Sequence, residues 1–119
     1  MTRPLQYDTI YDNPDLSTSV IACSNGDNGL ATKGYDTIGE LPSYPRVGGA
    51  PFAGWNSPDC GSCWRLTYKG RNLTVMAIDR SYGWNLSLQA MNDLTDGHAE
   101  ELGKVQATYT RVANSECGL

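Results

Sequence analysis

The sequence predicts a small, mainly β domain, a closed β-barrel with short helical additions that is held by disulfides. Its length of 119 residues is that of one domain. The chain holds 13 glycines, 6 prolines and a single phenylalanine, and this composition favours tight turns and short strands over a helical bundle. It also holds four cysteines, and disulfides are typical of small secreted domains.

The first half of the chain predicts loops around one short strand. Residues 1–6 are expected to form a flexible tail. Residues 17–23 are interpreted as the first strand. Six turn formers follow at residues 24–29 and predict a loop whose small polar residues expose backbone N–H groups to a ligand. Residues 34–61 contain four prolines and are expected to be irregular and held covalently by a cysteine.

The second half of the chain predicts three clearer strands. Residues 63–68 alternate with period two, and residues 73–79 form a mostly apolar run that ends in a carboxylate. The four residues 69–72 between them fit the turn of a hairpin. Residues 104–112 are expected to form the last strand.

Two short helices are expected before that last strand. Ser87 fits the N-cap of a helix that runs to Leu94 with an apolar stripe on one face. Residues 99–102 predict a second short helix, closed by Gly103. Short strands interrupted by two small helices indicate a closed barrel with α additions.

The charge of the chain argues against two classes of partner. The formal net charge is −4, and no cluster of lysine and arginine occurs. A nucleic-acid binder needs a basic stripe to neutralise phosphates, so we expect no nucleic-acid partner. The apolar run at residues 75–78 is far too short to span a bilayer, so we expect no membrane span.

The four cysteines allow three pairings, among which the sequence alone does not choose. They are Cys23, Cys60, Cys63 and Cys117. A bond between Cys60 and Cys63 would close an unusually small ring, so each is expected to join a distant partner, in an oxidising, extracellular compartment. A redox Cys-x-x-Cys site is disfavoured because a strand follows the pair instead of a helix. With one histidine and no second cysteine pair, we expect neither a metal nor another cofactor.

A set of short motifs spreads over residues 7–117. They are Tyr7-Asp8 with Tyr11, Ala22-Cys23-Ser24-Asn25-Gly26, Tyr44-Pro45 with Gly48-Gly49, Gly54-Trp55-Asn56-Ser57-Pro58, Cys60-Gly61-Ser62-Cys63-Trp64, Asp79, Ala90-Met91 and Gly103-Lys104-Val105. Through this set the chain resembles the cerato-platanin family of small secreted fungal proteins.

The resemblance implies a fold, a location and an activity. The expected fold is a six-stranded double-psi β-barrel over residues 7–119, with two or three short helices and the disulfides Cys23–Cys60 and Cys63–Cys117. The family is related to expansin barrels and plant barwin-type domains. The resemblance also implies location in the cell wall, binding of chitin-derived N-acetylglucosamine oligomers and other wall polysaccharide, expansin-like loosening, and activity as an elicitor of plant defence through a plant surface receptor.

Asp79 is the most informative single residue, because it ends an apolar strand and so places a charge at the rim of a barrel. By resemblance it matches the aspartate that expansin-type barrels present to glycans. The alternative is a carboxylate that satisfies local backbone N–H groups or pairs with Arg80. A glycosidase would need a second carboxylate across the scissile bond. The candidates Asp27, Asp36 and Asp59 lie in loops with no residues that tune an acid or base, so we predict binding without a catalytic residue.

Further side chains are expected to line a shallow glycan groove around Asp79. One wall would be the loop of Ser24, Asn25, Gly26 and Asp27, whose alternative interpretation is a plain tight turn. Asn85 could contact ligand, carry a glycan or help to start the following helix. Trp55 is a further candidate for this groove, where it would stack on a sugar ring, and a place in the core is equally consistent with its sequence context.

The other aromatic residues are judged from their sequence context. Tyr82 and Trp84 flank Gly83 in a turn and are expected to be exposed, where they would stack on sugar rings or form a patch for self-assembly. Trp64 is expected in the core. Two rival functions remain, a hydrolase or lytic transglycosylase with Asp79 as acid, and a surface-active structural protein.

Overall fold

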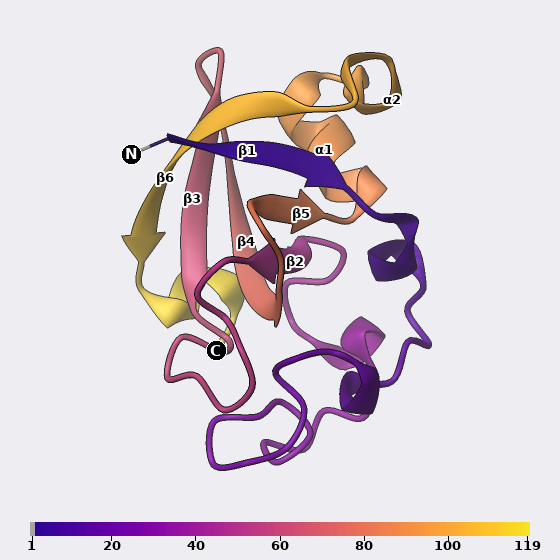
Figure 1. Ribbon diagram of the computed structural model, residues 1–119, viewed down its shortest axis with the longest axis vertical. Coiled ribbons are helices and arrows are strands. Elements are labelled where there is room, and N and C mark those ends of the chain that lie inside the picture. The colour runs from indigo at the N-terminus through magenta and orange to yellow at the C-terminus, as the bar shows by residue number, and fades with distance from the viewer. Residues whose placement is uncertain (1) are drawn as a thin grey trace.

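The computed structural model describes residues 2–119, and six strands among them close into a barrel (Figure 1). The strands are β1 (Thr2–Tyr7), β2 (Val47–Ala50), β3 (Cys63–Tyr68), β4 (Arg71–Arg80), β5 (Trp84–Leu86) and β6 (Val105–Val112). They close in the order β1-β5-β2-β4-β3-β6. The ladders β1–β5 and β2–β4 are parallel and the other four are antiparallel. The mainly β, six-stranded barrel is therefore confirmed.

The helices lie where local sequence signals place them. They are α1 (Leu88–Thr95) and α2 (Ala99–Leu102), with the 3-10 turns η1 (Thr9–Asp12), η2 (Thr18–Val20), η3 (Ile38–Glu40) and η4 (Asn114–Cys117). The Ser87 hydroxyl caps α1 by accepting the Ala90 N–H at 3.1 Å, as expected. Gly103 closes α2 at a φ of 69°.

A second cap on α1 comes from a residue distant in sequence. The Asp12 carboxylate accepts the backbone N–H of Leu88 at 2.7 Å and that of Gln89 at 3.0 Å. These donors lie in the first turn of α1 and have no partner within the helix. A negative charge at a helix N-terminus is also favoured by the helix dipole. Asp12 thus joins η1 to α1.

Replacing Asp12 with alanine is expected to lower the free energy of unfolding by about 1–2 kcal/mol, because two first-turn N–H groups lose a charged acceptor. Urea unfolding followed by circular dichroism measures the change. Asp15→Ala is the matched control, since Asp15 is exposed and its carboxylate makes no hydrogen bond or ion pair within residues 2–119. An equal stability loss in both variants would contradict the role of Asp12 as a cap.

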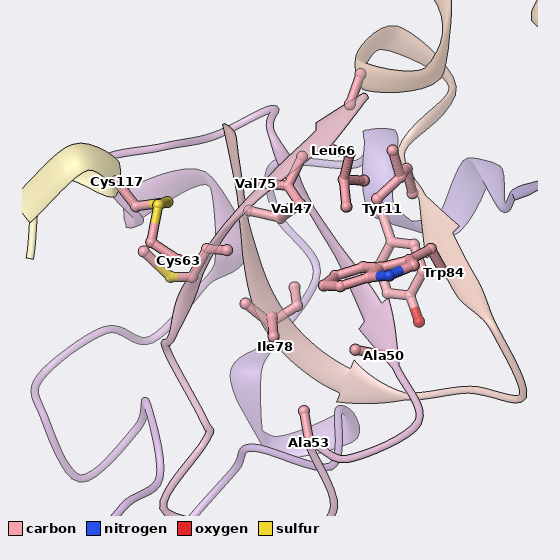
Figure 2. Packing of buried hydrophobic residues seen from close by; sticks show 14 of the residues in the cluster. Tyr11, Val47, Ala50, Ala53, Cys63, Leu66, Val75, Ile78, Trp84 and Cys117 are labelled. Carbon is pink, nitrogen blue, oxygen red and sulfur yellow. A yellow bond between two sulfur atoms is a disulfide. The ribbon is translucent and has the colours of Figure 1, made fainter. Parts of the chain in front are cut away.

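The core fills the inside of the barrel and extends under the loops beside it (Figure 2). Trp84, on β5, is wholly buried. Its ring lies 5.8 Å from that of Phe52, 5.9 Å from that of Trp64 and 6.0 Å from that of Tyr109. The expectation that Trp84 is exposed is therefore wrong, whereas Trp64 packs against the core as expected.

Two disulfides bind the loops and the C-terminus to the barrel. They join Cys23 to Cys60 and Cys63 to Cys117, across 37 and 54 residues. These are the pairs that the family resemblance implies. The first bond links the 24–29 loop to the irregular segment before β3, and the second links β3 to η4.

Residues 2–6 do not form the expected flexible tail, because Thr2–Tyr7 is a strand of the barrel wall. β1 pairs with β5 on one side and with β6 on the other, and Leu5 is wholly buried. The strand depends on partners more than 75 positions away, so local sequence gives little sign of it. Met1, the first residue of the expected tail, lies outside the described residues.

Two further expectations in the first half of the chain are wrong. Residues 17–23 form the turn η2 and bends instead of a strand, because the Ser17 hydroxyl accepts the Ser19 N–H and bends the chain locally. Inside the segment expected to be irregular lies β2, whose four residues are all buried. A Cβ on its Gly48 would stand 2.5 Å from the Asn85 carbonyl oxygen, so this strand needs glycine to fit between its neighbours.

Candidate functional site

The Asp79 carboxylate, near the end of β4, is a junction of three chain segments. Its Oδ1 accepts the backbone N–H of Ala22 at 2.8 Å and that of Arg80 at 2.9 Å. Its Oδ2 accepts the Tyr11 hydroxyl at 2.7 Å. The carboxylate therefore satisfies backbone N–H groups, as the alternative interpretation expected, and it touches Arg80 through the main chain.

Tyr11, on η1, is the partner that sequence reasoning missed. Its side chain is buried and belongs to the hydrophobic core (Figure 2). Burial first, and then the hydrogen bond to the Asp79 carboxylate, raise the pKa of Tyr11 above its usual range. The hydroxyl accordingly stays protonated and donates to Asp79. The sequence marked Tyr11 only as part of a motif, because 68 positions separate it from Asp79.

Strand β2 lies between Asp79 and Asn85 in the barrel wall. Gly49 of β2 pairs with Asp79 on β4 and with Asn85 on β5. The register of β2 against β4 shifts between Gly48 and Gly49, so the two strands meet at a local irregularity beside Asp79. The Ser81 hydroxyl lies over Gly49, since a Cβ on Gly49 would come within 2.7 Å of it.

Asn85, on β5, carries a buried side-chain acceptor beside Gly49. Its Oδ1 is buried and has no hydrogen-bond partner among residues 2–119. A buried acceptor without a partner is uncommon in folded proteins. The neighbouring Ser81 hydroxyl is not its donor, because that hydroxyl donates to the Gly83 carbonyl.

The loop at residues 24–28 and the loop at residues 54–57 form one unit. The Trp55 indole N–H donates to Asn25 Oδ1 at 2.6 Å, although Trp55 remains 62% exposed. Asn56 accepts the Asn28 N–H at its side-chain oxygen and the Asn28 amide group at its carbonyl, each at 3.0 Å. Together with the adjacent disulfide, these bonds fix the expected wall of the groove.

The remaining wall residues take different positions. Gly26 packs closely on Asn56, since a Cβ on it would stand 2.7 Å from the Asn56 side-chain oxygen. Asp27 is exposed and Ser24 is half-buried. Tyr82 is 85% exposed in the turn between β4 and β5. The expected exposure of Tyr82 is therefore confirmed.

The structure connects some of the residues that were predicted to bind glycan. Trp55 bonds Asn25, Asp79 bonds Ala22 two positions before the 24–28 loop, and Asp79 and Asn85 both pair with Gly49. A hollow of about 380 Å³ lies elsewhere, at the tip of the β3–β4 hairpin beside α1 and α2, and none of the predicted glycan residues lines it. A glycan groove at Asp79 stays a prediction.

The carboxylates considered as catalytic partners of Asp79 differ in their surroundings. Asp59 is paired with Arg111, whose guanidinium lies 2.8 Å from its Oδ1. Asp27 and Asp36 are exposed. Among residues 2–119 no three histidine, cysteine, aspartate or glutamate side chains gather so as to hold a metal ion. No helix in this part of the chain is long and apolar enough to cross a membrane.

Both the sequence and the fold of this chain are similar to those of known proteins. A family model described as cerato-platanin matches residues 4–119. The heat-stable 19 kDa antigen of Coccidioides immitis is 52% identical over 120 residues, which cover 99% of this chain and 82% of the antigen. The crystal structure of cerato-platanin 3 from M. perniciosa superposes with a TM-score of 0.94 at 44% identity, over all of both chains. The solution structure of the fungal elicitor Cerato-Platanin gives a TM-score of 0.86 at 41% identity, over 96% of this chain and 95% of that one.

Proposed function

The chain belongs to the cerato-platanin family, and from that premise we propose that it is a secreted protein that binds chitin-derived oligomers in the cell wall without cleaving them. The observation that carries the proposal is the fixed carboxylate of Asp79, with exposed Trp55 and Tyr82 on nearby loops. Two disulfides fit an oxidising, extracellular location.

The hydrogen bonds of Asp79 leave it able to accept from a sugar. An ionised carboxylate offers about four acceptor positions. Three are taken by Ala22, Arg80 and Tyr11. The remaining position suits one sugar hydroxyl. The apolar faces of sugar rings would stack on Trp55 and Tyr82.

The same hydrogen bonds argue against hydrolysis. A general acid must approach the glycosidic oxygen and deliver a proton, whereas Asp79 is held from two loops and its own strand as an acceptor. A second carboxylate must also face it across the scissile bond. Asp59 is engaged by Arg111, and Asp27 is exposed, with no side-chain partner in the part of the chain that the structure describes.

Binding by a few weak contacts fits a loosening function. Each hydrogen bond contributes on the order of 1 kcal/mol net in water. One sugar unit is therefore bound weakly, and several units must be engaged together. We infer that the protein competes with contacts between polysaccharide chains, as in expansin-like loosening. The solved structure described as a fungal elicitor supports the further proposal that a plant surface receptor perceives this chain and starts a defence response.

Titration with chitin oligomers of two to six sugars tests the binding site. We expect amide shifts at residues 22–28, 54–57 and 79–85, with affinity that rises with oligomer length. Asp79→Asn is expected to weaken binding about fivefold to tenfold, because one charged acceptor is lost. Asp93→Asn is the matched control, an exposed carboxylate on α1.

Three results would contradict this proposal. Amide shifts confined to another surface would place the glycan elsewhere. Release of reducing ends from chitin or cellulose, abolished by Asp79→Asn, would favour the hydrolase. Film formation that needs Trp55 and Tyr82 but not Asp79, without oligomer binding, would favour a surface-active protein. Urea unfolding of each variant separates a lost contact from a lost fold.

A further inference from the structure

A hollow of about 380 Å³ opens at the end of the barrel opposite the glycan face. It lies between the tip of the β3–β4 hairpin and the pair α1–α2, at the top of Figure 1, whereas the loops that follow η2 lie at the bottom. Its volume is within the range of small-molecule sites, about 300–1,000 Å³. No residue of the proposed glycan site lines it, so an inference about it is independent of the proposed function.

The apolar part of the hollow's lining comes from the β3–β4 hairpin and from the helices α1 and α2. Leu94 of α1 is wholly buried at its base, and Leu102 of α2 is 40% exposed at its edge. The ring of Tyr68, the last residue of β3, is half-buried on the opposite side. Leu102 and Tyr68 therefore supply accessible apolar surface to this lining.

All but one of the charged groups around the hollow already have partners. Arg71 donates to the Asp93 carbonyl at 3.0 and 3.3 Å and lies 4.0 Å from Asp96. His98 lies 3.0 Å from Glu101. Lys69 is the exception, because within residues 2–119 its ammonium has no carboxylate in reach and lies only over the Tyr68 ring, 5.5 Å from the centroid.

Lys69 also stands at a backbone position that does not favour lysine. The loop between β3 and β4 has two residues, Lys69 at a φ of 48° and Gly70 at a φ of 79°. Hairpin loops with two positive φ values strongly prefer asparagine, aspartate or glycine at the first position. A lysine held in the left-handed region costs stability, and such residues are concentrated where a ligand is bound.

From these observations we propose that the hollow binds a small amphipathic acid, with its apolar body on Leu102 and Tyr68 and its single anionic group on the Lys69 ammonium. The ligand carries one negative charge and not several, because Asp96 and Glu101 stand at the same rim and repel additional anions. An aromatic or aliphatic monoacid has this chemistry.

Two dyes with the same apolar body test this assignment. The probe is 8-anilinonaphthalene-1-sulfonate, and its neutral counterpart is N-phenyl-1-naphthylamine, which lacks the sulfonate. Each is titrated into the folded, oxidised, ¹⁵N-labelled chain. We expect amide shifts at residues 68–71 and 94–102, and tighter binding of the sulfonate than of the neutral dye.

Three variants test the charged group and the apolar surface of the site separately. Lys69→Gln is expected to weaken sulfonate binding about threefold to fivefold, the effect of one partly exposed ion pair, and to leave the neutral dye unchanged. Leu102→Ser is expected to weaken binding of both dyes. Lys33→Gln is the matched control, an exposed lysine outside the hollow, and is expected to change neither.

The turn geometry gives a second measurement. Lys69→Asn is expected to raise the urea midpoint, because asparagine tolerates the positive φ, and to lose the same share of sulfonate affinity as Lys69→Gln. The proposal is overturned if Lys69→Gln binds the sulfonate as well as the unchanged chain does, or if Leu102→Ser binds both dyes normally. Amide shifts confined to the surface of Trp55 and Tyr82, or none at millimolar dye, also overturn it.

Discussion

Replacing Cys63 and Cys117 together with alanine is expected to lower the free energy of unfolding by about 4 kcal/mol in the chain-entropy account, because the closed loop spans 54 residues. Domains of this kind are stable by only about 5–15 kcal/mol. The variant should therefore remain folded at room temperature with a much lower urea midpoint. Both cysteines are buried, and alanine avoids placing a hydroxyl there.

The second disulfide supplies the matched comparison. Cys23→Ala with Cys60→Ala opens a loop of 37 residues and should cost a similar amount of stability. Only this variant is expected to shift the amides of residues 24–28 and 54–57 and to weaken binding of chitin oligomers. Equal oligomer affinities in the two double variants would show that the bond next to the loops does not order the glycan face.

Trp84→Ala is expected to lower the free energy of unfolding by about 3–5 kcal/mol, the usual cost of emptying a buried aromatic site. Trp84 is wholly buried and its ring meets those of Phe52, Trp64 and Tyr109. Tyr82→Ala, two positions earlier at 85% exposure, should change stability by less than about 0.5 kcal/mol. Urea unfolding followed by far-ultraviolet circular dichroism compares the pair.

A third variant separates the volume of Trp84 from its polar group. The indole Nε1 is buried and has no hydrogen-bond partner among the described residues. Trp84→Phe therefore loses volume but no hydrogen bond, and it should cost clearly less than Trp84→Ala. If the phenylalanine variant were as unstable as the alanine variant, the indole N–H would have a stabilising partner after all.

Local signals in the sequence were sufficient for the elements that depend on neighbours in the chain. Ser87 lies three positions from the N–H that it caps, and Gly103 closes α2 through a positive φ. The β3–β4 hairpin follows from alternation and a short turn. These features are set within a few residues, so the sequence predicts them well.

Sequence reasoning missed three strands, β1, β2 and β5, and each depends on distant partners. β1 contains Pro4 and has only one fully buried residue, Leu5, so its pattern is weak on its own. β2 contains two adjacent glycines, which disfavour a strand locally, yet they let β4 and β5 approach from both sides. Such strands are defined by closure of the barrel, which no short window of sequence contains.

In the candidate site, too, the sequence predicts what neighbouring residues determine and misses what distant partners determine. Asp79 was predicted from an apolar run that ends in a carboxylate, a pattern that a short window contains. Its donors Tyr11 and Ala22 lie 68 and 57 positions away, so the network around it was beyond local reasoning. Trp84 was misplaced because β5 has only three residues, too few for its alternation to stand out from the preceding turn.

Strand β1 completes the wall by pairing with β5 in parallel and with β6 in antiparallel orientation. Without Thr2–Tyr7, both neighbours would present rows of unpaired N–H and C=O groups, which readily recruit strands from other molecules. Proteolytic removal of β1 would thus turn a self-contained barrel into an open sheet prone to aggregation.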